Sequence, residues 1–172
     1  LLILDGGPCA VGIESTIIDC TRGAPVLLRP GSITAAQVEA ACGRKLLSKD
    51  ELLAQEAPSP RASGTLESHY APSATVRLMD AKALQAALDL LGTAEAPDRR
   101  PTIALYHRAP LELRTPLVSA HRMPTDAAVA AHELFSKLRE MDAQGVKLIW
   151  VETPPETLAW DGVRDRLTRA AA

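Results

Sequence analysis

The chain has 172 residues, of which 47% are hydrophobic and 23% are charged, and its formal net charge is −2. These values are ordinary for a soluble globular protein of one or two small domains. They exclude an overall polyanion-binding charge, so any RNA contact is expected to be weak and local, or made through a partner protein.

Residues 1–45 show the pattern of strand, Gly-rich turn, strand, turn, strand and helix. The three strands are expected at residues 1–4, 13–19 and 26–28. Thr34 and Gln37 form a capping box for a helix that runs to about Cys42. Because three short strands and one helix cannot bury a core alone, and because the chain begins inside an apolar run, we interpret this part as the C-terminal end of an α/β domain in a longer protein.

Residues 46–73 are polar, contain three prolines after residue 57 and show little periodicity. This composition predicts a linker. It is long for a simple connection, and long ordered loops often have functions such as closing over an active site.

Residues 74–172 alternate between strand and helix patterns. The strands are expected at residues 75–79, 102–106, 117–120 and 147–151, and the first helix at 81–91, ending at Gly92. This alternation predicts an α/β fold with a mostly parallel sheet and helices on its faces.

Two further helices are predicted in this part. The first is capped by Thr125 and followed by Gly145, and its apolar side is expected at Ala128, Ala131, Phe135, Leu138 and Met141. The second covers residues 157–170, and its apolar side is expected at Leu158, Val163 and Leu167. The charged residues of this last helix, Arg164, Asp165, Arg166 and Arg169, are interpreted as a solvated face.

Cysteine and histidine residues give no sign of a metal site. Cys9, Cys20 and Cys42 are an odd number without a CxxC pair, which argues against a zinc site or a disulfide framework and favours a reducing, cytoplasmic compartment. The histidines at 107, 121 and 132 lack metal-ligand spacing and are interpreted as structural or surface residues. No apolar run reaches transmembrane length, so no membrane contact is expected.

The segment Glu14-Ser15-Thr16 places short hydroxyl groups beside a Gly-rich loop. On a strand, Ser15 would point to one side and its two neighbours to the other. Such hydroxyl groups suit a small polar ligand, but they also commonly satisfy neighbouring backbone groups. Both interpretations remain open from the residues alone.

Arg29 follows an apolar strand and precedes a Pro-Gly turn, which suits a bidentate contact to phosphate or carboxylate, although the residue by itself favours a surface ion pair. His69 and Tyr70 lie inside the predicted linker. The tyrosine could cover a flat base or donate a hydrogen bond, or the pair could simply attach the linker to a domain surface.

Four motifs occur in order along the chain: DGGPCAVGIESTIIDC, VLLRPGSIT, SGTLESHYAP, and a C-terminal region with LFSKLREMDAQGVKLIWVETPPE and RDRLTRAA. Together they resemble the long-form threonylcarbamoyl-AMP synthases, YrdC-like proteins with an extra C-terminal domain. The resemblance implies a Rossmann-like domain at 74–172. It also implies the end of a YrdC-like catalytic domain at 1–45, and a linker at 46–73 that folds over the active site.

The activity implied by this resemblance is that of a nucleotidyltransferase. Such a synthase forms L-threonylcarbamoyladenylate from L-threonine, bicarbonate and ATP, with release of pyrophosphate and assistance from Mg²⁺. Its product passes to partner proteins that modify the adenosine beside the anticodon of certain tRNAs.

The resemblance also implies roles for individual residues, although it assigns no catalytic residue. Ser15 falls on the serine that contacts threonine, and Arg29 and Tyr70 fall on residues that contact ATP. The residues expected to support them are Thr16, His69 and Asp5. The Lys-x-Arg motif of the family has no counterpart here, so the chain alone is expected to be inactive.

Two alternatives remain beside this interpretation. The chain could be a non-catalytic α/β module that binds a nucleotide or a partner protein, with residues 1–73 acting as a tether. It could also be a proteolytic fragment without a function of its own.

Overall fold

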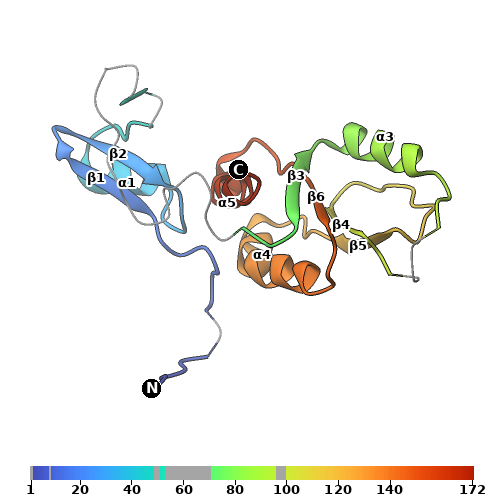
Figure 1. The fold of residues 1–172 in the computed structure, drawn as a ribbon. Helices are drawn as coiled ribbons and strands as arrows, with labels where there is room; N and C mark the ends of the chain where they lie inside the picture. Colours follow the sequence, from blue (N-terminus) through green and yellow to red (C-terminus); the bar gives the residue numbers. More distant parts are fainter. Residues whose placement is uncertain (1, 8, 49–50, 53–70, 96–99) are drawn as a thin grey trace.

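The structure is a computed structural model that describes residues 2–7, 9–48, 51–52, 71–95 and 100–172. Its elements run in the order β1 (Ile17–Arg22), β2 (Ala24–Arg29), α1 (Ala35–Cys42), β3 (Thr75–Met79), α3 (Ala81–Leu91), β4 (Ile103–His107), β5 (Val118–Arg122), α4 (Ala127–Asp142), β6 (Leu148–Glu152), a 3₁₀ turn (Leu158–Trp160) and α5 (Asp161–Ala170). Figure 1 shows two units: an N-terminal unit of β1, β2 and α1, and a C-terminal unit that holds all later elements.

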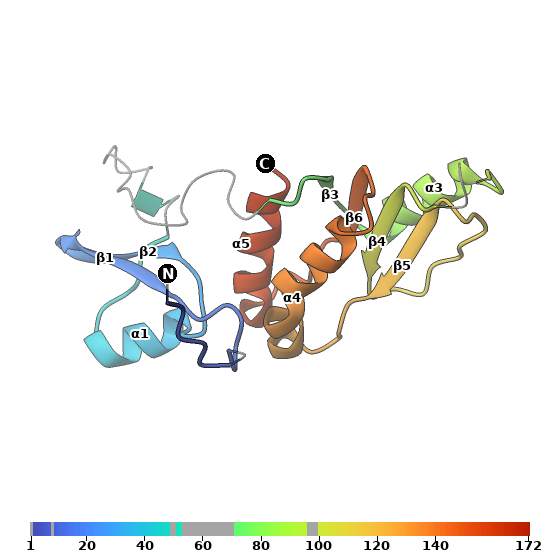
Figure 2. The same ribbon diagram turned by 60° about the horizontal axis from the view of Figure 1, so that its bottom comes forward.

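The C-terminal unit is built on a sheet of strand order β3-β6-β4-β5 in which every neighbouring pair is parallel. Figure 2 shows α3 on one face of this sheet and α4 and α5 on the other. Every residue of β4 is buried. Ala104 and Tyr106 pack with α4 and α5, whereas Ile103 and Leu105 pack with α3. The predicted parallel α/β fold with helices on both faces is confirmed.

Helix α4 begins one residue later than the sequence pattern predicts. Its N-cap is Asp126, whose carboxylate accepts the Val129 N–H at 2.9 Å, so the predicted cap at Thr125 is wrong. The buried positions are Ala130, Leu134, Leu138 and Met141. The predicted apolar side was therefore displaced at its start, where Ala128 is exposed.

Helix α5 differs more strongly from the prediction. A 3₁₀ turn precedes it, in which Trp160 is buried and Leu158 is 76% exposed, so the helix does not begin at 157. Its buried residues are Val163, Arg166, Leu167 and Ala170. The expectation of a fully solvated charged face is wrong because Arg166 lies on the buried face of the helix.

The N-terminal unit has little core of its own. Strands β1 and β2 pair antiparallel, and α1 carries the predicted capping box at Thr34 but no buried residue. Val26, Leu28 and Leu52 form its buried cluster. Residues 46–48, from the predicted linker, run beside β2, where the Leu47 N–H donates to the Pro25 carbonyl at 2.9 Å. The proposed division at residue 45 remains a prediction.

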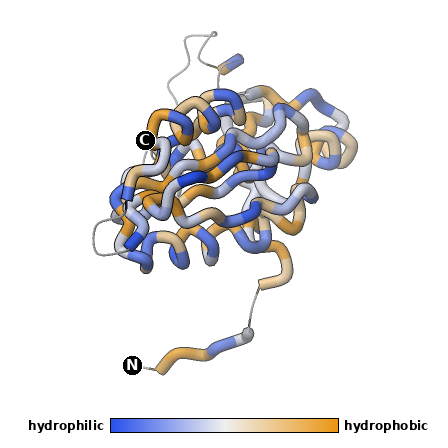
Figure 3. The backbone as a smooth tube through the Cα atoms, turned by 90° about the vertical axis from the view of Figure 1, so that its right-hand side faces the viewer, coloured by the Kyte–Doolittle hydropathy of each residue, from blue (hydrophilic) through white to orange (hydrophobic). Residues whose placement is uncertain are grey.

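Two strand predictions in the N-terminal unit are wrong. Leu2, Ile3 and Leu4 are between 78% and 89% exposed, and the extended N-terminal segment projects away from the rest of the chain (Figure 3). Their apolar character alone predicted a strand, but they pair with no strand among the described residues. Strand β1 begins at Ile17 instead of residue 13, because the preceding residues make tertiary contacts of their own.

A buried carboxylate connects the carboxyl ends of β4 and β6. Glu152 is 6% exposed and accepts the backbone N–H groups of Arg108 and Ala109 at 2.6 and 2.7 Å. It also pairs with the Arg108 guanidinium at 3.2 Å, and that guanidinium lies over the Trp160 ring. Open parallel sheets often bind ligands at this edge, but here an internal ion pair occupies the ends of the two central strands.

Within the described part, no helix is long and apolar enough to span a membrane. The three cysteines are free and exposed.

Candidate functional site

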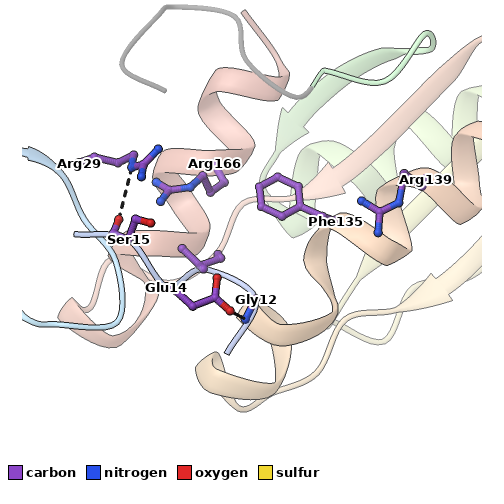
Figure 4. Close-up of a pocket in the computed structure, with 8 residues that line it drawn as sticks. Gly12, Glu14, Ser15, Arg29, Phe135, Arg139 and Arg166 are labelled. Atoms are coloured by element: carbon purple, nitrogen blue, oxygen red, sulfur yellow. Dashed lines mark hydrogen bonds between the residues drawn. The ribbon is translucent and has the colours of Figure 1, made fainter. Parts of the chain in front are cut away.

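A cavity of about 270 Å³ lies where the N-terminal unit meets α4 and α5. Figure 4 shows that side chains from both units surround it. The residues that line it are Gly12, Ile13, Glu14, Ser15, Arg29, Phe135, Arg139 and Arg166. This cavity brings together Ser15 and Arg29, two of the three residues for which the resemblance implied ligand contacts; the third, Tyr70, lies outside the described residues.

The segment of residues 12–15, here called the docking segment, attaches the N-terminal unit to the C-terminal unit. Ile13 is 4% exposed and belongs to the core formed with α4 and α5. Gly12 has a φ of +84°, and a Cβ atom there would lie 2.6 Å from the Ala131 carbonyl oxygen of α4. Only glycine therefore permits this close approach without displacement of the helix.

The turn after β2 holds the docking segment beside Arg29. A Cβ atom on Gly31 would lie 2.5 Å from the Ser15 carbonyl oxygen, so the two backbones are in direct contact. Ser32 donates to the Glu14 carbonyl from its backbone N–H at 3.2 Å and from its hydroxyl at 2.8 Å. The Arg29 Nε–H donates to the Ser15 carbonyl at 3.3 Å. These bonds fix Ser15 and Arg29 relative to each other.

Thr16 is not among the residues that line the cavity. Its hydroxyl donates to the Ile33 carbonyl at 2.9 Å and accepts the Ile33 N–H at 3.1 Å, which ties the docking segment to the turn. Glu14 and Ser15 both line the cavity, so the alternation expected of a regular strand does not hold here. Asp5 accepts the Gly7 N–H at 2.8 Å and is not among the lining residues. His69 and Tyr70 lie outside the described residues.

Arg166 reaches the cavity from the buried face of α5 and is 7% exposed. It pairs with Asp165, which also accepts from Arg169 at 2.8 and 3.0 Å. Burial lowers the pKa of Arg166, and although Asp165 raises it, the positive charges of Arg29 and Arg169 lower it further. The Asp165 carboxylate is thus shared between the guanidinium groups of Arg166 and Arg169, and the guanidinium of Arg29 lies close enough to affect the pKa of Arg166.

Glu14 carries the single carboxylate among the lining residues. Its Oε1 accepts the Gly12 N–H at 2.7 Å, and backbone hydrogen bonds lower its pKa. In the part of the chain that is described, no three His, Cys, Asp or Glu side chains come together in a way that could hold a metal ion. The Mg²⁺ ion that the resemblance implies stays a prediction, and we derive no step through it.

Sequence reasoning missed the contribution of the C-terminal unit to this cavity. Phe135, Arg139 and Arg166 line it from α4 and α5. One signal was available: Arg166 follows Val163 by three residues and precedes Ala170 by four, which places it on the buried face of a helix. The proximity of this face to Arg29 depends on tertiary docking and has no signal in the local sequence.

Comparisons with known proteins agree on one family. Residues 33–172 match the family described as "Threonylcarbamoyl-AMP synthase, C-terminal domain". Three proteins named threonylcarbamoyl-AMP synthase are similar to this chain. The protein from Bacillus subtilis is 31% identical over 98% of the chain, and the protein from Pyrococcus abyssi is 28% identical over 98% of it. The protein from Schizosaccharomyces pombe is 29% identical over 99% of the chain. The chain spans about half the length of these relatives, with shares of 48%, 48% and 45% respectively.

Solved structures agree with this assignment. The crystal structure of P. abyssi Sua5 complexed with L-threonine matches 97% of this chain and 48% of that chain, with 26% identity and a TM-score of 0.72. A second P. abyssi Sua5 structure, with H234A/Y235A substitutions, has a TM-score of 0.74 at 24% identity, and supports the fold alone. The chain therefore belongs to the family defined by the C-terminal domain of the threonylcarbamoyl-AMP synthases.

Proposed function

We propose that this chain is the C-terminal part of an L-threonylcarbamoyladenylate synthase, a nucleotidyltransferase. The whole enzyme would convert L-threonine, bicarbonate and ATP to threonylcarbamoyl-AMP and pyrophosphate, and tRNA-modifying proteins in the cytoplasm would consume the product. The observation that supports this proposal most directly is that Ser15 and Arg29 line one cavity. A similar structure, that of P. abyssi Sua5, was solved as a complex with L-threonine.

In this proposal, Ser15 and Arg29 bind different substrates. The Ser15 hydroxyl can hydrogen-bond an amino acid without ionisation of either group. Arg29 extends from the end of β2, and its bond to the Ser15 carbonyl holds the guanidinium at the cavity. A fixed cation at this position would bind phosphate oxygens and stabilise charge as pyrophosphate leaves, with little reorganisation. No covalent nucleophile is required.

The linker would complete the site. We infer that Tyr70, with His69 beside it, contacts the nucleotide, and that the linker closes over the bound substrates. Closure would exclude water, which hydrolyses labile adenylates. Thr16 would hold the docking segment in place through its bonds to Ile33.

The test compares Michaelis constants in a protein of the relatives' full length, with the residues upstream of Leu1 supplied. We expect Ser15→Ala to raise KM for threonine more than KM for ATP, and Arg29→Ala to do the reverse. Loss of the Arg29 charge should lower the rate about 10- to 1000-fold. Arg44→Ala is the matched control, because Arg44 is exposed, contacts the Gly23 carbonyl and does not line the cavity. Equal effects of the Ser15 and Arg29 variants on both constants would contradict the assignment.

The 172-residue chain alone should show no release of pyrophosphate that depends on threonine and bicarbonate, because it spans only about half the length of the synthases that it matches. Such release by the isolated chain would contradict this prediction. Calorimetric titration with ATP tests the alternative of a non-catalytic nucleotide-binding module. Tight ATP binding that survives Arg29→Ala would favour the alternative. The structure gives one argument against it, because the Glu152–Arg108 ion pair occupies the ends of β4 and β6, where a nucleotide site of the C-terminal unit would be expected.

A further inference from the structure

A second cavity, of about 210 Å³, lies on helix α4 beside the first. It is lined by Ala71 and Pro72 together with Phe135, Leu138, Arg139 and Asp142 of α4. Phe135 and Arg139 line both cavities, and Figure 4 shows them on the α4 side of the first. The second cavity therefore adjoins the one that holds Ser15 and Arg29. Residues 71–74, here called the exit segment, thus leave the predicted linker next to the candidate site.

The carboxylate of Asp142, the last residue of α4, holds the exit segment against this helix. Its Oδ2 accepts the Ser73 N–H at 3.0 Å, and its Oδ1 accepts the Ala74 N–H at 2.9 Å. The ladder between β3 and β6 begins only with Thr75, whose N–H donates to the Lys147 carbonyl at 3.0 Å. The carboxylate therefore accepts from the two backbone N–H groups that lie just before the ladder.

This contact depends on a carboxylate and fixes one end of the exit segment. Each carboxylate oxygen accepts one N–H group, and the charge strengthens both bonds, whereas a side-chain amide has a single acceptor oxygen. Ala74 is 6% exposed and belongs to the core of the C-terminal unit. Ala71, at the other end of the segment, is exposed and lines the second cavity. The bonds to Asp142 thus set the direction in which the chain runs from the core to the two cavities.

We propose that Asp142 is a positioning residue of the synthase, which acts by fixing the point at which the linker joins the C-terminal unit. Tyr70, to which the proposed function gives a contact with the nucleotide, immediately precedes Ala71 in the sequence. One peptide unit keeps their Cα atoms about 3.8 Å apart, so a fixed exit segment limits the positions open to Tyr70. Fewer positions mean a smaller loss of conformational entropy when ATP binds. This inference rests on the proposed function and extends it, because a residue of α4 then contributes to the affinity for ATP.

The first test measures Michaelis constants in a protein of the relatives' full length. Asp142→Asn keeps the size of the side chain but leaves one of the two N–H groups without its acceptor. We expect it to raise KM for ATP at least about threefold and to leave KM for threonine unchanged. A purely structural role would lower kcat through a smaller folded fraction and would change neither constant. Glu140→Gln is the matched control, because Glu140 also belongs to α4, pairs with Lys137 at 2.6 Å and lines neither cavity.

The second test asks whether Asp142 acts through Tyr70. Tyr70→Ala removes the proposed contact and should raise KM for ATP at least as much as Asp142→Asn does. Because a positioning residue has no effect once the group that it positions is gone, the double variant should have the same KM for ATP as Tyr70→Ala alone. Two effects that multiply would show independent action and would overturn the proposal. If Asp142→Asn does not fold, Asp142→Glu, which keeps both acceptor oxygens on a longer side chain, takes its place in both tests.

The outcomes separate this inference from the proposed function. If Tyr70→Ala raises KM for ATP while Asp142→Asn matches Glu140→Gln, the inference fails and the proposed function stands. If Asp142→Asn raises KM for threonine as much as KM for ATP, its effect is not directed at the nucleotide, and the inference again fails alone. If Tyr70→Ala itself leaves KM for ATP unchanged, the proposed contact of Tyr70 with the nucleotide fails, and the inference fails with it.

Discussion

The two units of this chain differ in how much structure each can support. The C-terminal unit has a four-stranded parallel sheet with an apolar cluster on each face. The N-terminal unit has a two-stranded sheet, a helix without buried residues, and a cluster of three buried side chains. It is fixed by the docking segment, whose Ile13 is buried in the core of the other unit.

This difference bears on the candidate site. Ser15 and Arg29 belong to the part with the smaller core, and their position depends on docking against α4 and α5. Local stability in proteins follows buried apolar contact, so the site residues should open more readily than the central strands. The predictions below test this comparison between the two units.

The largest expected effect comes from the core of the C-terminal unit. Leu134→Ala leaves a cavity at a fully buried position and should cost about 3 kcal/mol, with a fall in Tm of about 10 °C. Leu28→Ala, in the N-terminal cluster, should lower the main transition much less, because that cluster is small and can collapse around the gap. Calorimetry measures both variants, and equal losses would contradict the unequal partition of stability.

A smaller effect is expected from the docking segment. Gly12→Ala should cost about 2 kcal/mol of docking free energy, since the added methyl would meet the Ala131 carbonyl of α4 at an unfavourable φ. Gly7→Ala is the matched control, with a φ of +85° and no atom within 4 Å of the added methyl. Hydrogen exchange of β1 and β2 amides should quicken in Gly12→Ala only. Equal exchange in both variants would show that the units are not coupled through this contact.

Local signals predicted the elements that rely on local interactions. Strand β3 and helix α3 have their expected bounds, because Asp80 caps the helix and Gly92 ends it. The strand expected at residues 1–4 is missing, since apolar character requires a partner surface. The prediction of a solvated charged face on α5 was wrong because Arg166 is buried. Its burial depends on the ion pair with Asp165, which a pattern of charged residues does not reveal.

The residues of the candidate site also differ in whether the sequence could predict them. The resemblance implied Ser15 and Arg29, and the structure brings them together through the bond between Arg29 and the Ser15 carbonyl. Arg139 and Arg166 could not be predicted as their neighbours, because their place follows from the packing of Ile13 and Gly12 on the helices. The role of Tyr70 stays a prediction.

The cap of α4 should have an effect of about 1 kcal/mol. Asp126→Ala removes the side-chain bond to the Val129 N–H, whereas Thr125→Ala should change the free energy of unfolding by less than about 0.5 kcal/mol. Gly12 packs against the first turns of this helix, so loss of the cap should slightly speed hydrogen exchange in the N-terminal unit. Urea unfolding measures the free energy of unfolding of both variants. A greater loss of this free energy in Thr125→Ala than in Asp126→Ala would indicate that Thr125 is the cap.

The smallest effect concerns pH and should be confined to the C-terminal unit, because no histidine precedes residue 69. Burial lowers the pKa of His121 below its usual 6.5, and nearby Lys137 lowers it further, while Glu140 and a hydrogen bond with Gln144 partly oppose the shift. The unfolded chain therefore takes up a proton at a higher pH than the folded chain. The contribution of His121 to the free energy of unfolding should be constant above about pH 7, and the free energy should fall as the pH drops through 6.5.

Urea unfolding at pH 7.5 and pH 5.5 measures this contribution, at values above the range in which carboxylates titrate. His121→Gln removes the titrating group and should lose less stability between the two pH values than the unsubstituted chain. His132→Gln, at an exposed position of α4, is the matched control and should retain the full pH dependence. If His121→Gln keeps the same dependence, the acid sensitivity arises elsewhere. If hydrogen exchange in β1 and β2 quickens at pH 5.5 as much as exchange in β4, the N-terminal unit follows the stability of its neighbour and the two units unfold together.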